Sequence, residues 1–302
     1  MKRYTCVIFL SLLEVPLVDA EEIKSPSVNE LQATADHGDA AGQFQLGRAY
    51  LRGEGVAKDP QKAFEWMKAA ADQGYADAVG GLGYFYSAGV AVPKDQKIAL
   101  DWFRKGAEKG SAKAQLNLGN LLLKGQGDTA ADPETQRKEG LQWIQKAADQ
   151  NLPEAALVYA NMAYFGDHGV EQNYELAAKY SKVAAEAGLA DAQNMLGNLY
   201  HYGWGGAHDT VLAEQWFRKA ALQGHIKAQS NLGSTLGPLS EPKEKRIEAI
   251  AWLLMAADQA EVTAEKELKD AVAGLNDGEM DAARKLVSEL RKQIHAKTSH
   301  PN

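Results

Sequence analysis

The stretch that decides the fold is "FEWMKAAADQG" at residues 64–74, because the chain repeats it at a nearly regular interval. Close variants are "LDWFRKGAEKG" at 100–110 and "AEQWFRKAALQG" at 213–224. An enzyme has no use for several evenly spaced copies of one active site. A stack of similar structural units does need the same joint between neighbours. The repetition therefore predicts a repeat protein.

Aligning the copies on their last residue gives six positions, five of them glycine: Gly38, Gly74, Gly110, Asn151, Gly188 and Gly224. A period of this length is typical of solenoids, in which each unit buries its apolar face against the next. The predicted units are 35–70, 71–106, 107–147, 148–184, 185–220 and 221–256.

Each unit is predicted to be a pair of helices. Ala78, Leu82 and Tyr86 share one face of a first helix, and Asp59 before Pro60 is a typical start of a second helix. Glycines in the middle of the first helix predict close approach of its partner, and the final Gly or Asn predicts a left-handed residue after the second. A large aromatic residue recurs in the second helix, where a stacked neighbour is expected to bury it: Trp66, Trp102, Trp143, Tyr180, Trp216 and Trp252.

Residues 35–70 resemble the Sel1-like repeat, a relative of the tetratricopeptide repeat, almost letter for letter: A-x-x-G-x-x-x-A-x-x-x-L-G-x-x-Y-x-x-G-x-G-V-x-x-D-x-x-K-A-x-x-W-x-x-K-A-A. The resemblance implies an all-α, right-handed α-solenoid. The sixth copy departs most, because "LGPLSEPKEK" at 236–245 replaces the glycine loop and the capping Asp. Related proteins are exported or periplasmic scaffolds, adaptors, envelope regulators and secreted factors. A cysteine-rich branch is linked to penicillin binding, but the only Cys here is Cys6.

The two ends differ from the repeats. Residues 1–20 are predicted to be a secretory signal peptide, because Lys2 and Arg3 precede an apolar run and V-x-A ends at Ala20; a buried or disordered N-terminus is the alternative. Residues 21–34 are predicted to form an entry helix whose S-x-x-E capping box is Ser27 and Glu30. Residues 257–298 are predicted to form C-terminal capping helices. Their last apolar stripe is Met280, Ala283, Val287, Leu290 and Ile294.

No motif for catalysis was found, so we expect no catalytic, cofactor-binding or metal-binding residues. His201 and His208 could be read as metal ligands, but solvated loop histidines are the favoured interpretation. The net charge of −7 argues against nucleic acid, and no later segment is apolar enough for membrane insertion once the leader is removed.

Polar and aromatic residues recur at equivalent positions of the first helices, near the central glycine of each repeat. The resemblance to the tetratricopeptide fold implies that these positions line a concave groove. Asparagine amides there could bind an extended peptide, or they could tie the repeats together. Trp204 could be an exposed anchor or could pack on a neighbouring loop. The predicted partner-binding residues are Arg48, Tyr84, Asn117, Asn120, Asn161, Tyr164, Asn194, Asn198, Tyr202, Trp204 and Asn231.

The sequence thus predicts an exported, periplasmic or secreted scaffold without catalytic activity that binds a protein or an extended peptide. Two alternatives remain open. The first is an envelope hydrolase or a protein that interacts with peptidoglycan or penicillin. The second is a secreted effector that binds host proteins. Perturbed carboxylates gathered in one cleft would favour the hydrolase. The partner and the oligomeric state do not follow from the sequence.

Overall fold

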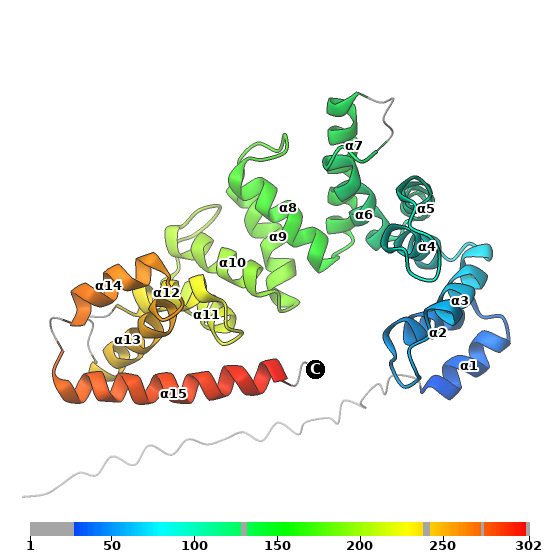
Figure 1. Cartoon of the computed structure of the whole chain (residues 1–302). Coiled ribbons are helices and arrows are strands. Elements are labelled where there is room, and N and C mark those ends of the chain that lie inside the picture. Colours follow the sequence, from blue (N-terminus) through cyan, green and yellow to red (C-terminus); the bar gives the residue numbers. More distant parts are fainter. Residues whose placement is uncertain (1–26, 128–131, 238–241, 273–274, 300–302) are drawn as a thin grey trace, which may run out of the picture.

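The computed structural model describes residues 27–127, 132–237, 242–272 and 275–299, which form fifteen helices and no strand (Figure 1). The predicted signal peptide lies outside these residues. The helices are α1 (Val28–Asp36), α2 (Ala40–Arg52), α3 (Pro60–Asp72), α4 (Ala76–Ala88), α5 (Gln96–Glu108), α6 (Ala112–Leu123), α7 (Pro133–Asp149), α8 (Pro153–Phe165), α9 (Tyr174–Glu186), α10 (Ala190–Tyr202), α11 (Thr210–Ala221), α12 (Ile226–Leu236), α13 (Lys243–Ala257), α14 (Val262–Val272) and α15 (Asp277–Ser299).

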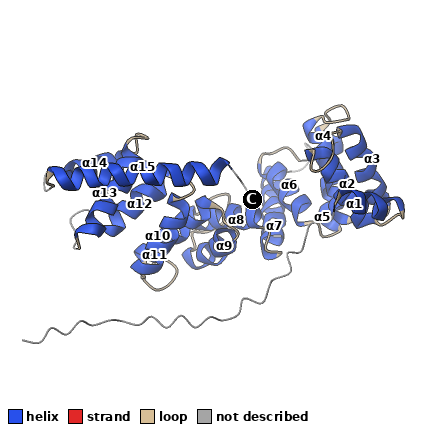
Figure 2. Ribbon diagram, turned by 90° about the horizontal axis from the view of Figure 1, so that it is seen from below, coloured by secondary structure: helices blue, strands red, loops and turns tan. Residues whose placement is uncertain are grey.

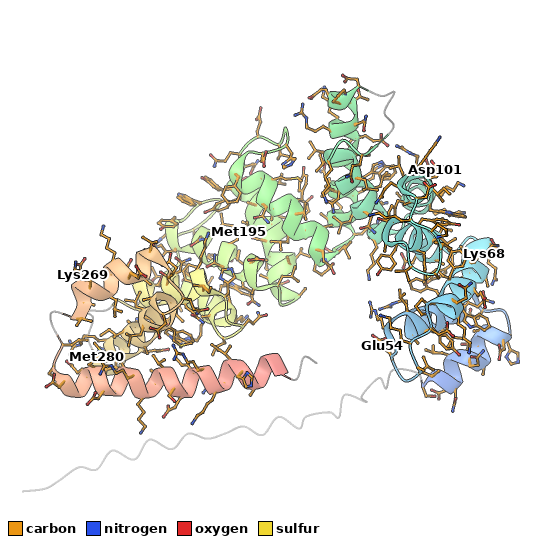
Figure 3. All side chains as sticks on the ribbon, viewed as in Figure 1. Glu54, Lys68, Asp101, Met195, Lys269 and Met280 are labelled. Carbon is orange, nitrogen blue, oxygen red and sulfur yellow. The ribbon has the colours of Figure 1, made fainter. Side chains whose placement is uncertain are left out.

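The helices from α2 to α13 form six antiparallel hairpins that follow one another along a curved arc (Figures 1 and 2). Each second helix packs on the first helix of its own hairpin and on the first helix of the next one. Polar side chains such as Lys68 and Asp101 are exposed on the second helices α3 and α5 (Figure 3). The predicted α-solenoid is confirmed.

The turn after each second helix has the predicted left-handed residue. The φ angle is 85° at Gly74, and it is 59° at Asn151, where the repeat has no glycine. The next amide closes the turn, since Tyr75 donates to the carbonyl of Ala70 at 3.1 Å. Asparagine tolerates this conformation better than most residues, which explains its place in the fourth repeat.

The glycines in the middle of the first helices let the second helices approach closely. A Cβ at Gly83 would lie 2.6 Å from the ring of Phe103, and one at Gly197 would lie 2.5 Å from the ring of Phe217. Both rings are buried. The close approach is therefore confirmed, and in these two hairpins the partner is an aromatic side chain of the second helix.

The expectation that every aromatic residue of the repeated slot is buried was wrong. Trp252 and Tyr180 are buried, but Trp66, Trp102, Trp143 and Trp216 are only half-buried. The position one residue later faces the first helix and fills the hairpin core. At Trp102, Trp143 and Trp216 a lysine three residues later lies over the ring, as with Lys219 at 3.9 Å from the ring centre of Trp216. The buried residues at the later position are Met67, Phe103, Ile144, Ser181, Phe217 and Leu253.

The predicted helix starts at Asp59 and Asp132 are also present. The Asp59 carboxylate accepts from the amides of Gln61 and Lys62, and the Asp132 carboxylate accepts from the amide of Thr135. In the sixth repeat Pro242 takes the cap position of α13 and supplies no side-chain bond. Both helices of that repeat form nevertheless, because their apolar faces are intact.

A buried glutamine runs through four of the six hairpins and joins the turn before the hairpin to the turn after it. Gln193 donates to the carbonyl of Ala185 at 3.1 Å and accepts from the Gln223 amide at 2.8 Å. We call this arrangement the glutamine clasp. Repeats two and four lack both glutamines. The clasp pairs are Gln43 with Gln73, Gln115 with Gln150, Gln193 with Gln223, and Gln229 with Gln259.

Helices pack on both ends of the solenoid. The Ser27 hydroxyl and the Glu30 carboxylate form a capping box at the start of α1. At the other end, Ala283, Val287 and Leu290 of α15 are buried against the core of the last repeats. The long α15 packs on α13 (Figure 1). Within the described residues, no helix is both long and apolar enough to span a lipid bilayer.

Candidate functional site

The first helices present two hollows, and most of the predicted partner-binding residues line one or the other. The N-terminal hollow, about 660 Å³, lies over α2, α4 and α6. The C-terminal hollow consists of two adjoining pockets, each about 470 Å³, over α8, α10 and α12. Arg48, Tyr84 and Asn117 line the first hollow, whereas Asn161, Tyr164, Asn194, Asn198, Tyr202, Trp204 and Asn231 line the second.

One wall of the C-terminal hollow is made of asparagine amides. The Asn231 amide on α12 donates to the side-chain oxygen of Asn194 at 2.9 Å and to that of Asn198 at 3.2 Å. These bonds tie α12 to α10. The NH₂ groups of Asn194 and Asn198 donate to no other described residue, and both side chains are half-exposed. The amides therefore join two repeats and can still donate to a ligand.

The other asparagines do not continue this wall. The Asn161 amide donates to the carbonyl of Leu157 in its own helix at 3.0 Å. Asn120 lines neither hollow. The structure thus brings Asn161 and Asn198 to one hollow and leaves Asn120 outside it.

An aromatic stack forms the rim of the C-terminal hollow. The ring of Trp204 lies between Tyr174, at 5.0 Å and 16°, and Tyr202, at 4.5 Å and 22°. Tyr164 meets it edge-on at 6.0 Å. Even so, 37% of Trp204 and 57% of Tyr202 remain exposed. Trp204 therefore packs on the preceding repeat and also keeps a face open to solvent.

The loop that carries Trp204 is held against the start of α9. Gly205 has a φ of 73°, and a Cβ there would lie 2.3 Å from the carbonyl oxygen of Tyr174. Only glycine permits this backbone approach without strain. The contact fixes Trp204 on Tyr174. The role of Tyr174 could not be predicted from the sequence, because no repeat-wide pattern marks that position.

Ionisable groups of both signs surround the C-terminal hollow. Asp191, His225, Lys227 and Glu261 line it. Burial opposes ionisation of Glu261, but hydrogen bonds from the Ala264 amide and the Ser230 hydroxyl outweigh it, so the pKa of Glu261 lies below its ordinary value.

Tyr164 at this hollow and His201, which lines neither of its pockets, have shifted pKa values. Burial raises the pKa of Tyr164, and the neighbouring Tyr174 and Tyr202 add to the shift. Burial lowers the pKa of His201, and His208 adds to it. Tyrosine is uncharged at neutral pH, so Tyr164 can offer a neutral hydroxyl to a ligand in the hollow.

The two histidines considered as metal ligands are not arranged for that role. The ring centres of His201 and His208 are 6.4 Å apart, and His201 is a half-buried residue of α10 rather than a loop residue. No group of three or more potential ligands (His, Cys, Asp or Glu) in the described part of the chain could hold a metal ion.

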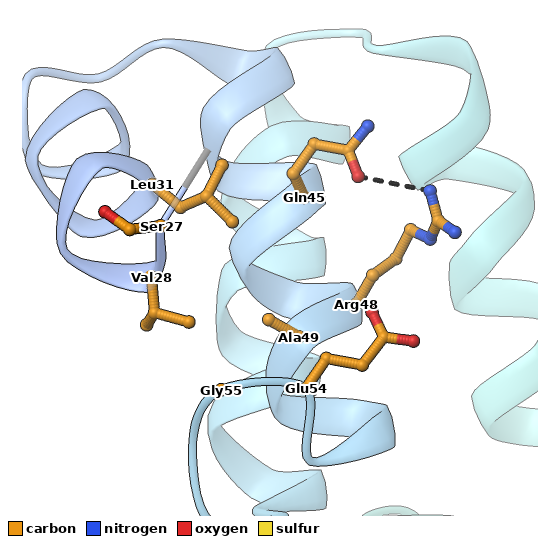
Figure 4. Close-up of a pocket in the computed structure, with 8 residues that line it drawn as sticks. All are labelled: Ser27, Val28, Leu31, Gln45, Arg48, Ala49, Glu54 and Gly55. Carbon is orange, nitrogen blue, oxygen red and sulfur yellow. Dashed lines mark hydrogen bonds between the residues drawn. The ribbon is translucent and has the colours of Figure 1, made fainter. Parts of the chain in front are cut away.

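A further pocket, about 560 Å³, lies between α1 and α2 (Figure 4). Arg48 lines both this pocket and the N-terminal hollow, and it donates to the Gln45 amide oxygen at 3.1 Å. Its guanidinium also lies 5.7 Å from the ring centre of Phe44. Arg48 is thus positioned by neutral partners.

The family model of the Sel1 repeat matches six consecutive segments of this chain. The matched segments are 40–75, 76–111, 112–152, 153–189, 190–225 and 226–261. These segments begin at the first helix of each hairpin, five residues after the start of the predicted units.

Relatives extend this result. A solved Sel1 repeat protein from Oxalobacter formigenes is 30% identical, covers 77% of this chain and all of its own, and superimposes with a TM-score of 0.59. An uncharacterized protein of Neisseria meningitidis is 34% identical over 94 residues, which is 31% of this chain. Chitin synthase regulatory factor 3 of Schizosaccharomyces pombe is 38% identical over 119 residues, which is 39% of this chain. The matches span only 20% and 12% of these two curated relatives.

Proposed function

This chain belongs to the Sel1 repeat family, whose members are generally protein-interaction scaffolds, and we propose that it is a non-catalytic scaffold that binds a protein or an extended peptide in the concave groove of the solenoid. The observation that carries the proposal is the C-terminal hollow, where the half-exposed Trp204 stack stands beside a wall of asparagine amides.

The chemistry of this hollow suits an extended backbone. An amide offers both a donor and acceptors, so Asn194 and Asn198 can pair with peptide groups along a strand without regard to sequence. Rigid aromatic rings lose little conformational entropy on binding, and Trp and Tyr are enriched among residues that dominate protein interfaces. The exposed faces of Tyr202 and Trp204 would then select an apolar side chain.

The carboxylates with shifted pKa values do not point to acid–base catalysis. Glu30, Glu139, Glu261 and Glu279 all have pKa values below the ordinary range. In each case the lowered pKa accompanies a helix cap or an ion pair, as in the pair of Glu139 and Arg104. A general acid needs the opposite shift, so these groups give the hydrolase alternative no support.

Photo-crosslinking tests the proposed site. A photoreactive amino acid is placed at Tyr202 in one variant and at Val211, on α11, in a matched control; 57% and 64% of these side chains are exposed. We expect a discrete protein adduct, identified by mass spectrometry, from position 202 only. Equal labelling at both positions, or none at 202, would count against the C-terminal hollow.

A second test separates binding from repeat stability. Changing both Asn194 and Asn198 to Ala removes the two bonds from Asn231, each worth about 0.5–1.5 kcal/mol. If these amides also bind ligand, partner capture per folded molecule falls. Lower unfolding free energy with unchanged capture would assign them to the joining of repeats alone.

We also propose that residues 1–20 act as a secretory signal, so that the scaffold works in the periplasm or outside the cell. The basic start, the apolar run and the V-x-A ending support this. Mature protein should begin at Glu21. Sequencing the N-terminus of protein from its own host tests the processing, and fractionation separates a periplasmic scaffold from a secreted effector. A retained Met1 would reject export by this route.

A further inference from the structure

The N-terminal hollow differs from the C-terminal one in both shape and charge. It is walled by three successive first helices, α2, α4 and α6, and it is one continuous space of about 660 Å³. Phe44, Met67, Phe85 and Val90 line its floor, so the bottom of the hollow is apolar. An apolar hollow rimmed by polar groups is the usual form of a binding site.

Two adjacent glycines line this hollow. Gly80 and Gly81 face it from α4 and supply no side chain. A Cβ at Gly80 would lie 2.6 Å from the Cβ of Ala114, and one at Gly81 would lie 2.8 Å from the sulfur of Met67. The helices are therefore closer together here than larger residues would permit, and the glycine backbone forms part of the wall of the hollow beside its apolar floor. Exposed Tyr84 stands beside it on the same helix.

The rim of the hollow is cationic, although the whole chain carries a net charge of −7. The lining cations are Arg48, Arg52, Lys58 and Lys113, and the lining carboxylate is Asp77.

These charges are not cancelled within the hollow. Asp77 accepts a hydrogen bond from the Ser111 hydroxyl at 2.6 Å and so is directed towards α6. Arg52 has a carboxylate partner, Glu54, at 3.2 Å. Lys58 and Lys113 are exposed, and neither forms an ion pair with a described residue. A local excess of cations over an apolar floor attracts a ligand that is anionic and carries an apolar group.

We propose that the N-terminal hollow is a second binding site, and that its ligand is an acidic peptide segment with one bulky apolar side chain. The apolar side chain packs on the apolar floor of the hollow beside Tyr84, and carboxylates on either side meet Lys58 and Lys113. This inference specifies the chemistry of a partner and therefore rests on the proposed scaffold function. It concerns residues outside the C-terminal hollow.

Peptide binding to the whole chain tests the inference. The probe is a fluorescein-labelled peptide of a central leucine flanked by pairs of glutamates, and its binding is followed by fluorescence anisotropy at low salt. Two matched probes replace the leucine by glycine or the glutamates by lysines. We expect the glycine probe to bind on the order of tenfold more weakly, because burial of a leucine side chain is lost. We expect no binding of the lysine probe.

Charge reversal locates the site. The double variant Lys58→Glu/Lys113→Glu should bind the acidic probe roughly tenfold more weakly, and raised salt should shrink the difference. The control Lys97→Glu/Lys285→Glu changes the net charge equally at exposed positions of α5 and α15, and it should bind within about twofold of the unchanged chain. Circular dichroism checks that both variants are folded.

Three results would overturn the inference: no binding of the acidic probe, equal losses in the two double variants, or binding of decanoate where the peptide does not bind. The last would assign the hollow to a fatty acid. If the acidic probe fails while Tyr202 still crosslinks to a partner, only this second site is rejected. Failure of both measurements rejects the scaffold proposal as well.

Discussion

Replacing Gly205 by Ala should release Trp204 from its stack. Alanine at a φ of 73° costs about 1–2 kcal/mol, and its Cβ would meet the Tyr174 carbonyl oxygen at 2.3 Å. Because that contact is with backbone, no rotation of a side chain relieves it. Absorbing such an overlap costs about 1–3 kcal/mol, whereas losing one aromatic contact costs about 0.5–1.5 kcal/mol. The loop should therefore move away from α9 rather than accept the overlap.

The neighbouring glycine provides a matched control. A Cβ at Gly206 would have no heavy atom within 4 Å, and the φ of Gly206 is outside the left-handed range. Gly206→Ala should change the free energy of unfolding by less than about 0.5 kcal/mol. Gly205→Ala should lower it by about 1.5–3.5 kcal/mol, which combines the left-handed strain with the lost stacking.

The assay is ¹⁹F NMR of protein labelled with 5-fluorotryptophan. The chain has six tryptophans, and the Trp204 signal is assigned with a Trp204→Phe variant. In Gly205→Ala that signal should move towards the position of solvent-exposed fluorotryptophan while the other signals stay in place. If the Trp204 signal is the same in Gly205→Ala and Gly206→Ala, the backbone contact does not hold the loop, and the reasoning is refuted.

Three further outcomes are expected. Phe217→Ala should cost about 3–5 kcal/mol in urea unfolding because 1% of that side chain is exposed, and the half-buried Trp216→Ala should cost clearly less; equal costs would contradict the assignment of the core position. Deleting residues 276–302 should uncover the apolar face of α13 and cause aggregation in light scattering, so a truncated chain that stays monomeric with an unchanged melting temperature would argue against a capping role. Because Glu279 bonds to Arg246 and has a lowered pKa, its contribution to stability should be present above the ordinary Glu pKa of about 4.3 and lost as the pH falls through its folded value, and Glu279→Gln should remove that part of the acid dependence of melting.

The repeat, its caps and its turns could be predicted from the sequence because each depends on residues close together in the chain. Asp59, Pro60 and Asn151 act on the backbone next to them, so their role follows from local rules. The face occupied by each aromatic residue depends on the crossing of two helices, and here the prediction for Trp216 was wrong by one position. The glutamine clasp left a visible signal, since Gln193 stands four residues before Gly197 and the same spacing recurs in three other repeats.

The sites were harder to predict because they combine residues from different repeats. The repeat positions expected to line the groove include Asn194, Asn198 and Asn231, and Asn231 does bond to the other two across two helices. The repeat pattern did not predict that Asn120 lies outside both hollows. The cationic rim needs Lys58 from a loop and Lys113 from a helix two repeats further on in the solenoid. Such a juxtaposition depends on the curvature of the stack, which no single repeat encodes.

The glutamine clasp has a mechanical consequence. The repeats of an α-solenoid resemble springs in series, whose compliances add, and the second and fourth repeats have Val79 and Ala156 where the others have a clasping glutamine. One of these more compliant repeats lies within the N-terminal hollow and the other at the edge of the C-terminal hollow. We therefore expect each hollow to change its width at the one repeat that lacks the clasp, while its clasped neighbours keep their shape.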